Sequence, residues 1–238
     1  MPRVCVISIA KSEEEFERLK RALERQTFRD FEFITSTKGS IPEAWNDAIS
    51  KALSKGCEIL VFTESDAFPL NERWLEEAAA NFKKEAVLKG LEINPTYFNM
   101  CNLVADAEIF KRVRFDESFK SAEDTELFAR LIKMGVEVKY VNAFPVVHIP
   151  TRTWRKTLAR GLRNGMYFMK IMYMHGKDAL QAVSTPNFVG NRVHPIGKRL
   201  QIIVENVLVL LGLLIGAIIY FPILIRRKLH QKNSEIHG

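Results

Sequence analysis

Several common signatures are missing from the sequence. Its three cysteines form no Cys-x-x-Cys pair, so neither a zinc knuckle nor a disulfide framework is indicated. Cys5, Cys57 and Cys101 each stand beside apolar residues, and we interpret them as small core residues in a reducing compartment. A glycine-rich dinucleotide fingerprint and a Walker-type phosphate loop are also missing, which weakens oxidoreductase and ATPase interpretations. The first residues lack the charged and apolar regions of a signal peptide, so we expect none.

Acidic residues are scarce in one part of the chain. Between Thr151 and Leu200, Asp178 is the only acid, whereas lysine and arginine occur ten times. The net charge of +7 favours anionic partners such as nucleic acid, acidic lipids or phosphorylated small molecules. From Trp154 the cations alternate with apolar residues, which predicts a basic amphipathic helix on a membrane surface; a solvated basic face is the alternative. We do not expect nucleic-acid binding, because this pattern offers no platform for stacked bases.

Charge is missing altogether between Val207 and Ile225. As a helix with a rise of 1.5 Å per residue, this run would be about 28 Å long, close to the thickness of a bilayer's hydrocarbon core. A membrane segment is favoured over a buried core helix by the flanking cations, which are Lys198, Arg199, Arg226, Arg227 and Lys228. A single span would put the basic tail outside a cytosolic catalytic domain, against the positive-inside tendency, so a re-entrant or tilted segment stays open.

Hydrophobic residues make up 47% of the 238 residues, enough for a sizeable core. A continuous apolar run predicts a buried strand at 4–10, and a second and a third strand are predicted at 31–35 and 58–63. Helical spacing predicts a helix after each strand, beginning near Ser12, Ser40 and Asn71. This order implies a parallel sheet covered on both faces, with ligands bound beyond the carboxyl ends of the strands. The second half is more mixed, with predicted strands at 86–93 and 136–141 and helices at 107–113 and 123–134.

Two acidic clusters and one histidine could carry chemistry. Glu64 and Asp66 follow the third strand and point to the same side, an arrangement that suits a divalent metal touching phosphate oxygens. The alternative is a pair of solvated loop acids. Three acids crowd the helix start at 123–126, where one could be a general base or all could simply favour the helix dipole. His148 follows an apolar run, where a packed histidine is the usual alternative to a ligand.

The order of these features resembles the large family of inverting GT-A glycosyltransferases of the family-2 type. The resemblance covers about residues 3–165. It rests on five stretches of the sequence, which are 4–23, 39–46, 61–69, 115–124 and 135–148. In the third stretch, Glu64-Ser65-Asp66 occupies the place of the family's Asp-x-Asp motif.

The resemblance implies roles for particular residues. Asp66, with Glu64, would hold Mg²⁺ or Mn²⁺ against the donor diphosphate, and His148 would be a further ligand. Asp124 would deprotonate the acceptor hydroxyl, and attack would invert the anomeric centre. Residues implied in donor binding are Ser8, Lys11, Thr37, Lys38, Asn46 and Ser65. Residues expected at the acceptor are Glu123, Trp154, Arg160 and Arg163.

The sequence departs from the family pattern at the donor site. Thr37 and Lys38 stand where the family usually has two aspartates, and Ser8 and Lys11 replace its proline and asparagine. These changes make an unusual donor or a catalytically inactive, membrane-tethered scaffold the alternatives to an ordinary enzyme. A nucleotidyltransferase, which shares the sheet and the metal acids, is a further alternative.

We therefore predict an α/β protein with a GT-A, Rossmann-like, mostly parallel sheet and C-terminal amphipathic and membrane helices. The expected regions are a catalytic domain at 1–150, with a donor half at 1–100 and an acceptor half at 101–150, an interface region at 151–199, a membrane segment at 200–225 and a basic tail at 226–238. The predicted activity is inverting, hexosyltransferase-like transfer of a sugar from a nucleotide-sugar to a polyprenyl-phosphate or lipid-linked glycan. The catalytic domain is expected on the cytosolic face of a membrane.

Overall fold

The chain divides into two compact units in the computed structural model. The first comprises Met1–Thr151 with Ala182–Arg192, and the second comprises Arg152–Gln181 with Val193–Gly238. The structure describes residues 2–10, 13–93, 99–149, 154–184, 204 and 206–222. The predicted catalytic domain, 1–150, falls within the first unit, whose described part holds two β-sheets.

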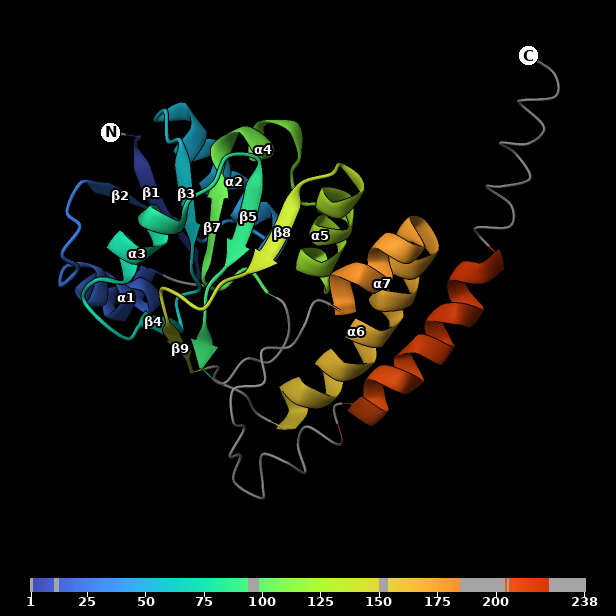
Figure 1. The fold of residues 1–238 in the computed structure, drawn as a ribbon. Helices are drawn as coiled ribbons and strands as arrows, with labels where there is room; N and C mark the ends of the chain where they lie inside the picture. Colours follow the sequence, from blue (N-terminus) through green and yellow to red (C-terminus); the bar gives the residue numbers. More distant parts are fainter. Residues whose placement is uncertain are drawn as a thin grey trace, which may run out of the picture. The chain divides into compact units, whose positions relative to one another are not determined.

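The larger sheet has six strands in the order β2-β1-β3-β7-β5-β8 (Figure 1). Their bounds are Phe31–Ser36, Val4–Ile9, Ile59–Phe62, Leu103–Asp106, Ala86–Lys89 and Glu137–Tyr140, in that order. The first three strands are parallel, as their buried apolar runs predict, and β5 and β8 are also parallel. However, β7 is antiparallel to both of its neighbours, so the sheet is mixed rather than mostly parallel.

A smaller sheet forms where the predicted strand 86–93 divides in two. Gly90 separates β5 from β6 (Glu92–Ile93), which pairs with β9 (Val146–His148), and β9 pairs in turn with β4 (Ala67–Pro69). A Cβ atom on Gly90 would lie only 2.2 Å from the ring of Phe144. This close approach explains why the chain leaves the larger sheet at a glycine.

Helices cover both faces of the larger sheet, as the alternating pattern predicts (Figure 1). Helices α1 (Phe16–Leu23) and α3 (Trp74–Asn81) pack with the side chains of one face, including Val6 and Val61. Helices α2 (Ile41–Ser54) and α4 (Ala107–Arg112) cover the other, where Phe62 contacts the rings of Trp45 and Phe110. Helix α5 (Glu123–Lys133) packs beside β8, and a short 3₁₀ turn, η1 (Glu13–Glu15), precedes α1.

The capping box predicted for α2 is present. The side-chain oxygen of Glu43 accepts a hydrogen bond from the backbone N–H of Ser40 at 2.6 Å, and the Ser40 side chain accepts one in return from the backbone of Glu43. This reciprocal pair fixes the start of α2 directly after β2. The corresponding residue before α1, Ser12, lies outside the described residues.

Two of the three cysteines are joined, which corrects the interpretation of all three as unpaired core residues. A disulfide links Cys5 in β1 with Cys57, just before β3, across a Cα–Cα distance of 5.9 Å. The sequence separation of 52 hides this proximity, which arises because β1 and β3 are neighbours in the sheet. Cys101 is free and buried. The pairing also removes the argument for a reducing compartment, where disulfides are rare.

The second unit contains α6 (Trp154–His175) and a helix at residues 206–222 that runs beside it. Helix α7 (Lys177–Ser184) follows α6 in the chain. Glycines bring the first two backbones together, because a Cβ on Gly212 would lie 2.1 Å from the carbonyl oxygen of Leu162. Gly216, four residues on, lies in the same way against Met166. Small residues at this spacing let helices approach closely.

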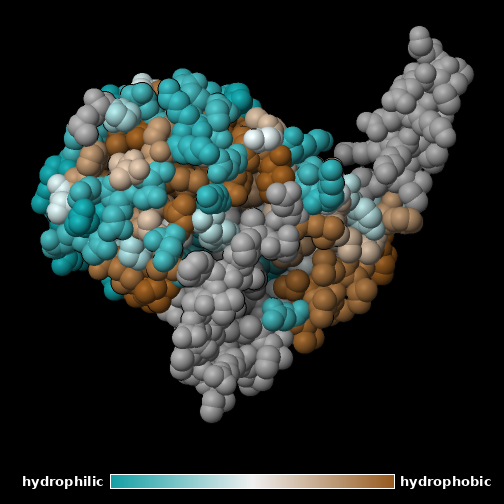
Figure 2. Space-filling model, viewed as in Figure 1, coloured by the Kyte–Doolittle hydropathy of each residue, from teal (hydrophilic) through white to brown (hydrophobic). Residues whose placement is uncertain are grey.

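The predicted membrane segment is not supported as a span. Within the described ranges, no helix reaches the length and apolar character needed to cross a membrane. Part of the segment predicted at 200–225 lies outside the described residues, as do 185–199 of the interface region and the tail at 226–238. Large hydrophobic side chains are nevertheless exposed on the second unit, where Figure 2 shows extensive hydrophobic surface. They include Trp154, Leu158, Leu210, Leu214, Ile218 and Phe221.

Candidate functional site

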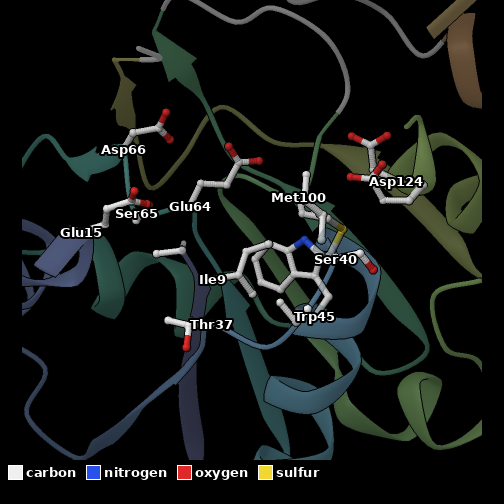
Figure 3. Close-up of a pocket in the computed structure, with 15 residues that line it drawn as sticks. Ile9, Glu15, Thr37, Ser40, Trp45, Glu64, Ser65, Asp66, Met100 and Asp124 are labelled. Atoms are coloured by element: carbon white, nitrogen blue, oxygen red, sulfur yellow. The ribbon is translucent and has the colours of Figure 1, made fainter. Parts of the chain in front are cut away.

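A cavity of about 520 Å³ opens at the carboxyl ends of β1, β2 and β3. Its wall includes Ile9 at the end of β1 with Ala10 after it, Thr37 and the start of α2 after β2, and the loop at 64–66 after β3. The other side is closed by Met100 and by Glu123 and Asp124 at the start of α5 (Figure 3). The cavity therefore lies where ligands bind in α/β sheets.

Asp66, Glu64 and His148 meet at one side of this cavity. The antiparallel register of β4 and β9 pairs Ala67 with His148, which places the histidine ring beside the loop before β4. His148 Nε2 lies 3.1 Å from Asp66 Oδ1 and 3.4 Å from Glu64 Oε2. The histidine side chain is only 5% exposed, whereas the two carboxylates are 39% and 31% exposed. The histidine is thus held inside the fold, whereas the two carboxylates are accessible from the cavity.

The electrostatics of this group favour a bound cation. Burial lowers the pKa of His148, but hydrogen bonds to Asp66, Glu64 and Glu92 outweigh it and raise that pKa to about 11. Three carboxylates around one imidazole therefore keep the ring protonated when no cation is bound, and a bound cation would take the place of the proton on Nε2. One ligand atom each from Glu64, Asp66 and His148 lie within 4.8 Å of one another. Two carboxylate oxygens and one imidazole nitrogen suit Mg²⁺ or Mn²⁺, so the donor set fits the predicted metal.

Asp124 stands on the other side of the cavity from this group, and Figure 3 shows Glu64 between it and Asp66. Its Oδ1 accepts hydrogen bonds from the backbone N–H of Thr125 at 2.7 Å and from the hydroxyl of Thr125 at 3.3 Å. Ala122, the residue before α5, adopts the left-handed conformation with φ 56°, and Glu123 and Asp124 in the first turn line the cavity.

The pKa of the Asp124 carboxyl is raised from its ordinary value of 3.8 to about 6. Burial is the main cause, the hydrogen bond from Thr125 opposes it, and the nearby Glu64 carboxylate adds to it. A carboxylate with a pKa near the working pH can accept a proton from a hydroxyl group. Asp124 therefore has the chemical properties of a general base.

The structure distributes the predicted donor residues unevenly. Thr37 and Ser65 line the cavity, whereas Lys38 and Ser8 are not among its wall residues. Ser8 is fully buried, and among the described residues its hydroxyl finds no hydrogen-bond partner. Lys11 lies outside the described residues.

Asn46, which was predicted at the donor, makes its described side-chain hydrogen bonds within the fold. Its amide nitrogen donates to the carbonyl oxygen of Phe115 and to Glu117, and its amide oxygen accepts from the backbone N–H of Phe115. These bonds tie α2 to the loop at 115–117. Asn46 is absent from the residues that line the cavity, and its amide is committed to the fold.

The predicted acceptor residues fall in both units. Glu123 lines the cavity beside Asp124. Trp154, Arg160 and Arg163 belong to α6 in the second unit, and their acceptor role stays a prediction.

Sequence reasoning missed the buried residues behind His148. His148 Nδ1 lies 2.7 Å from Glu92 Oε1, and Glu92 is paired with Lys89 at 2.9 Å. The available clue was a lysine inside the apolar strand Ala86–Lys89, because a buried cation needs a buried partner. The partner's identity could not be read from the sequence, since it depends on how β5, β6 and β9 meet.

Comparisons with solved structures identify the fold. The mannosyltransferase PcManGT from Pyrobaculum calidifontis, solved with GDP-Man and Mn²⁺, is similar with a TM-score of 0.59 and 14% sequence identity, over 99% of this chain and 80% of that one. S. aureus TarS is similar with a TM-score of 0.50 and 14% identity, over 84% of this chain and 47% of that one. No family model and no curated protein matches the sequence. The α/β fold with a mixed sheet is similar to that of this mannosyltransferase, which agrees with the predicted α/β class but not with the predicted mostly parallel sheet.

Proposed function

We propose that this protein is a glycosyltransferase that moves a sugar from a nucleotide-sugar to a membrane-associated acceptor, with inversion and with the help of Mg²⁺ or Mn²⁺. The observation that carries the proposal is a cavity at the carboxyl edge of the sheet that is lined on one side by Glu64 and Asp66, which contact His148, and on the other by Asp124. A metal-binding group and a general base on opposite walls of one cavity are the two parts that this reaction needs.

The donor would lie across the ends of β1 and β2. The cavity has the size of an ordinary small-molecule site, which is roughly 300–1,000 Å³. Gly39, Ser40 and Ile41 bring the start of α2 to its wall, where backbone N–H groups and the helix dipole favour phosphate. PcManGT, with the same fold, was solved with GDP-Man and Mn²⁺, which supports a nucleotide-sugar as the donor class.

Glu64, Asp66 and His148 would hold the cation. When bound, the cation would neutralise the charge that develops on the departing nucleoside diphosphate. Asp124 would accept the proton of the acceptor hydroxyl at its carboxylate, which the N–H and hydroxyl of Thr125 hold in place. Such a base accounts for about 10²- to 10⁴-fold in rate. Attack on the face opposite the diphosphate would invert the anomeric centre.

A membrane-associated acceptor is proposed from the second unit. Its exposed apolar side chains, which include Trp154 and Leu158, alternate on α6 with arginine and lysine. Helices of this composition bind anionic membrane surfaces, at about 1 kcal/mol for each cation near the surface. We propose peripheral attachment with the catalytic unit on the cytosolic side, where the Cys5–Cys57 disulfide would be an exception to the usual rule. Flotation of the full chain with anionic but not neutral liposomes tests attachment, and protease protection in membrane vesicles tests the side.

The activity is tested by incubating the full chain with a panel of nucleotide-sugars, with Mn²⁺ or with EDTA, and identifying the products. We expect release of a nucleoside diphosphate that EDTA and Asp66→Asn each reduce at least tenfold. Asp30→Asn is the matched control, because Asp30 is exposed and precedes the amino end of β2, opposite the cavity. Release of pyrophosphate instead would identify a nucleotidyltransferase, and metal-dependent binding without turnover would identify an inactive scaffold.

A further inference from the structure

A buried polar network lies behind the candidate metal ligands, on the side away from the cavity. Lys89 at the end of β5 and Glu92 in β6 are each only 2% exposed, and their charged atoms are 2.9 Å apart. Burial of an ion pair costs desolvation energy, so a pair that contributes only to stability is readily replaced by apolar residues. The Lys89–Glu92 pair lies directly against His148, which suggests a role in the site as well as in stability.

The histidine ring is held from both sides. Its Nδ1 donates to Glu92 Oε1 at 2.7 Å, which directs Nε2 toward Asp66 and Glu64. A ring that could rotate freely would present either nitrogen, or neither, to a cation. Carboxylates that accept from the far nitrogen of a ligating histidine fix the ring and increase its basicity as a ligand.

Glu92 is itself fixed by Lys89. The Lys89 ammonium donates to Glu92 Oε2, to Asn99 Oδ1 at 2.5 Å and to the carbonyl oxygen of Cys101. Asn99 Oδ1 also accepts from the backbone N–H of Cys101 at 3.1 Å. The lysine thus ties the glutamate to backbone just before β7. A side chain with this many bonds has one orientation, and the orientation passes from Lys89 through Glu92 to His148.

A separate metal site on Glu92, Cys101 and His148 is the competing interpretation, because their ligand atoms also lie close together. The ammonium of Lys89 argues against it. A divalent cation there would sit beside a buried positive charge that already neutralises Glu92. Glu64 and Asp66, which border the cavity, contact His148, and within the described part of the chain neither forms an ion pair with a lysine or arginine.

We propose that Glu92, held by Lys89, is a positioning residue that fixes His148 with Nε2 toward Glu64 and Asp66 and thereby sets the affinity for the divalent cation. This inference rests on the metal role proposed above. The effect passes through His148 alone, because Glu92 contacts neither Glu64 nor Asp66 among the described hydrogen bonds.

The test measures Mn²⁺ binding to the full chain without any donor, by titration calorimetry and by the electron paramagnetic resonance signal of free Mn²⁺. We expect Glu92→Gln to weaken binding about 10- to 100-fold, the usual effect of removing such a partner. Glu126→Gln is the matched control, since Glu126 is equally buried in an ion pair with Arg130. It should lose stability and keep the wild-type affinity.

A double-mutant cycle separates positioning from a general structural effect. In a His148→Ala background, Glu92→Gln should change Mn²⁺ affinity by less than about twofold, because the residue through which it acts is gone. If Glu92→Gln fails to fold, Lys89→Met with Glu92→Gln removes both charges together, a change that buried pairs often tolerate. It should show the same loss of affinity.

The outcomes distinguish this inference from the function on which it rests. Equal Mn²⁺ affinity in the wild type and in folded Glu92→Gln, or the same loss with and without His148, overturns the positioning role and leaves the metal site intact. A wild-type protein that binds no Mn²⁺ overturns both.

Discussion

Replacing Asp124 with asparagine should inactivate the protein and stabilise it at the same time. Asparagine keeps an oxygen that can accept the hydrogen bonds from Thr125 but cannot take up a proton. Without its base the reaction should slow about 10²- to 10⁴-fold. The stabilisation follows from the raised pKa of the partly buried carboxyl, which makes its ionisation unfavourable in the folded state.

The size of the stabilisation can be worked out from that pKa. A pKa raised from 3.8 to about 6 corresponds to about 3 kcal/mol of destabilisation once the group is ionised. Asp124 lines an open cavity and is partly exposed, so we reduce this to about 1–2 kcal/mol. Between these pKa values the folded state holds a proton that the unfolded state has released. Native stability therefore falls as pH rises through this window, and the whole cost is present above about pH 6.

Thermal unfolding at a series of pH values measures the effect. At pH 7.5 the variant should melt about 2–8 °C above the wild type, and the difference should vanish as the pH is lowered toward 4. Asp30→Asn should show no such gain, because Asp30 is exposed. A variant that is inactive but not stabilised at pH 7.5 would refute the claim that burial raises the pKa of the Asp124 carboxyl. A stabilised variant with full turnover would remove Asp124 from the role of base.

Three further predictions concern the same site. In the wild type, kcat/KM should fall about tenfold per pH unit below about pH 6, because Asp124 takes up a proton there. A rate of nucleoside diphosphate release that stays constant down to about pH 5 would exclude Asp124 as the base. Because His148 is protonated below about pH 11, binding of Mn²⁺ should displace a proton, and the affinity for Mn²⁺ should therefore rise with pH. Calorimetry in buffers of different ionisation enthalpy should detect the released proton. A binding enthalpy that does not depend on the buffer would contradict histidine ligation. Asn46→Ala should lower the free energy of unfolding, measured in urea, by about 1–3 kcal/mol, because the substitution leaves the backbone groups of Phe115 without these partners. The KM for the donor should stay within twofold of the wild-type value. A large rise in this KM with unchanged stability would instead support the donor role predicted for Asn46.

Local sequence patterns predicted the elements of the first unit well. The apolar run at Val4–Ile9 and the capping box of Ser40 and Glu43 describe strand and helix directly, because burial on both faces and helix-end hydrogen bonds are local requirements. The position of the cavity followed from the same patterns, since parallel strands end at one edge. The antiparallel β7 was not predicted, because strand direction depends on pairings between distant segments.

What the sequence determined by itself was therefore the alternation of strands and helices, the two acids that follow the third strand and the acids at the start of the helix at 123–134. Only the tertiary structure decided which side chains meet. The register of β4 with β9 brought His148 to Asp66, and the junction of β5 with β6 buried Lys89 against Glu92. Neighbouring strands likewise joined Cys5 to Cys57. The physical reason is the same in each case: periodicity and capping act within a few residues, whereas a contact across a sheet depends on pairings that the whole fold must satisfy together.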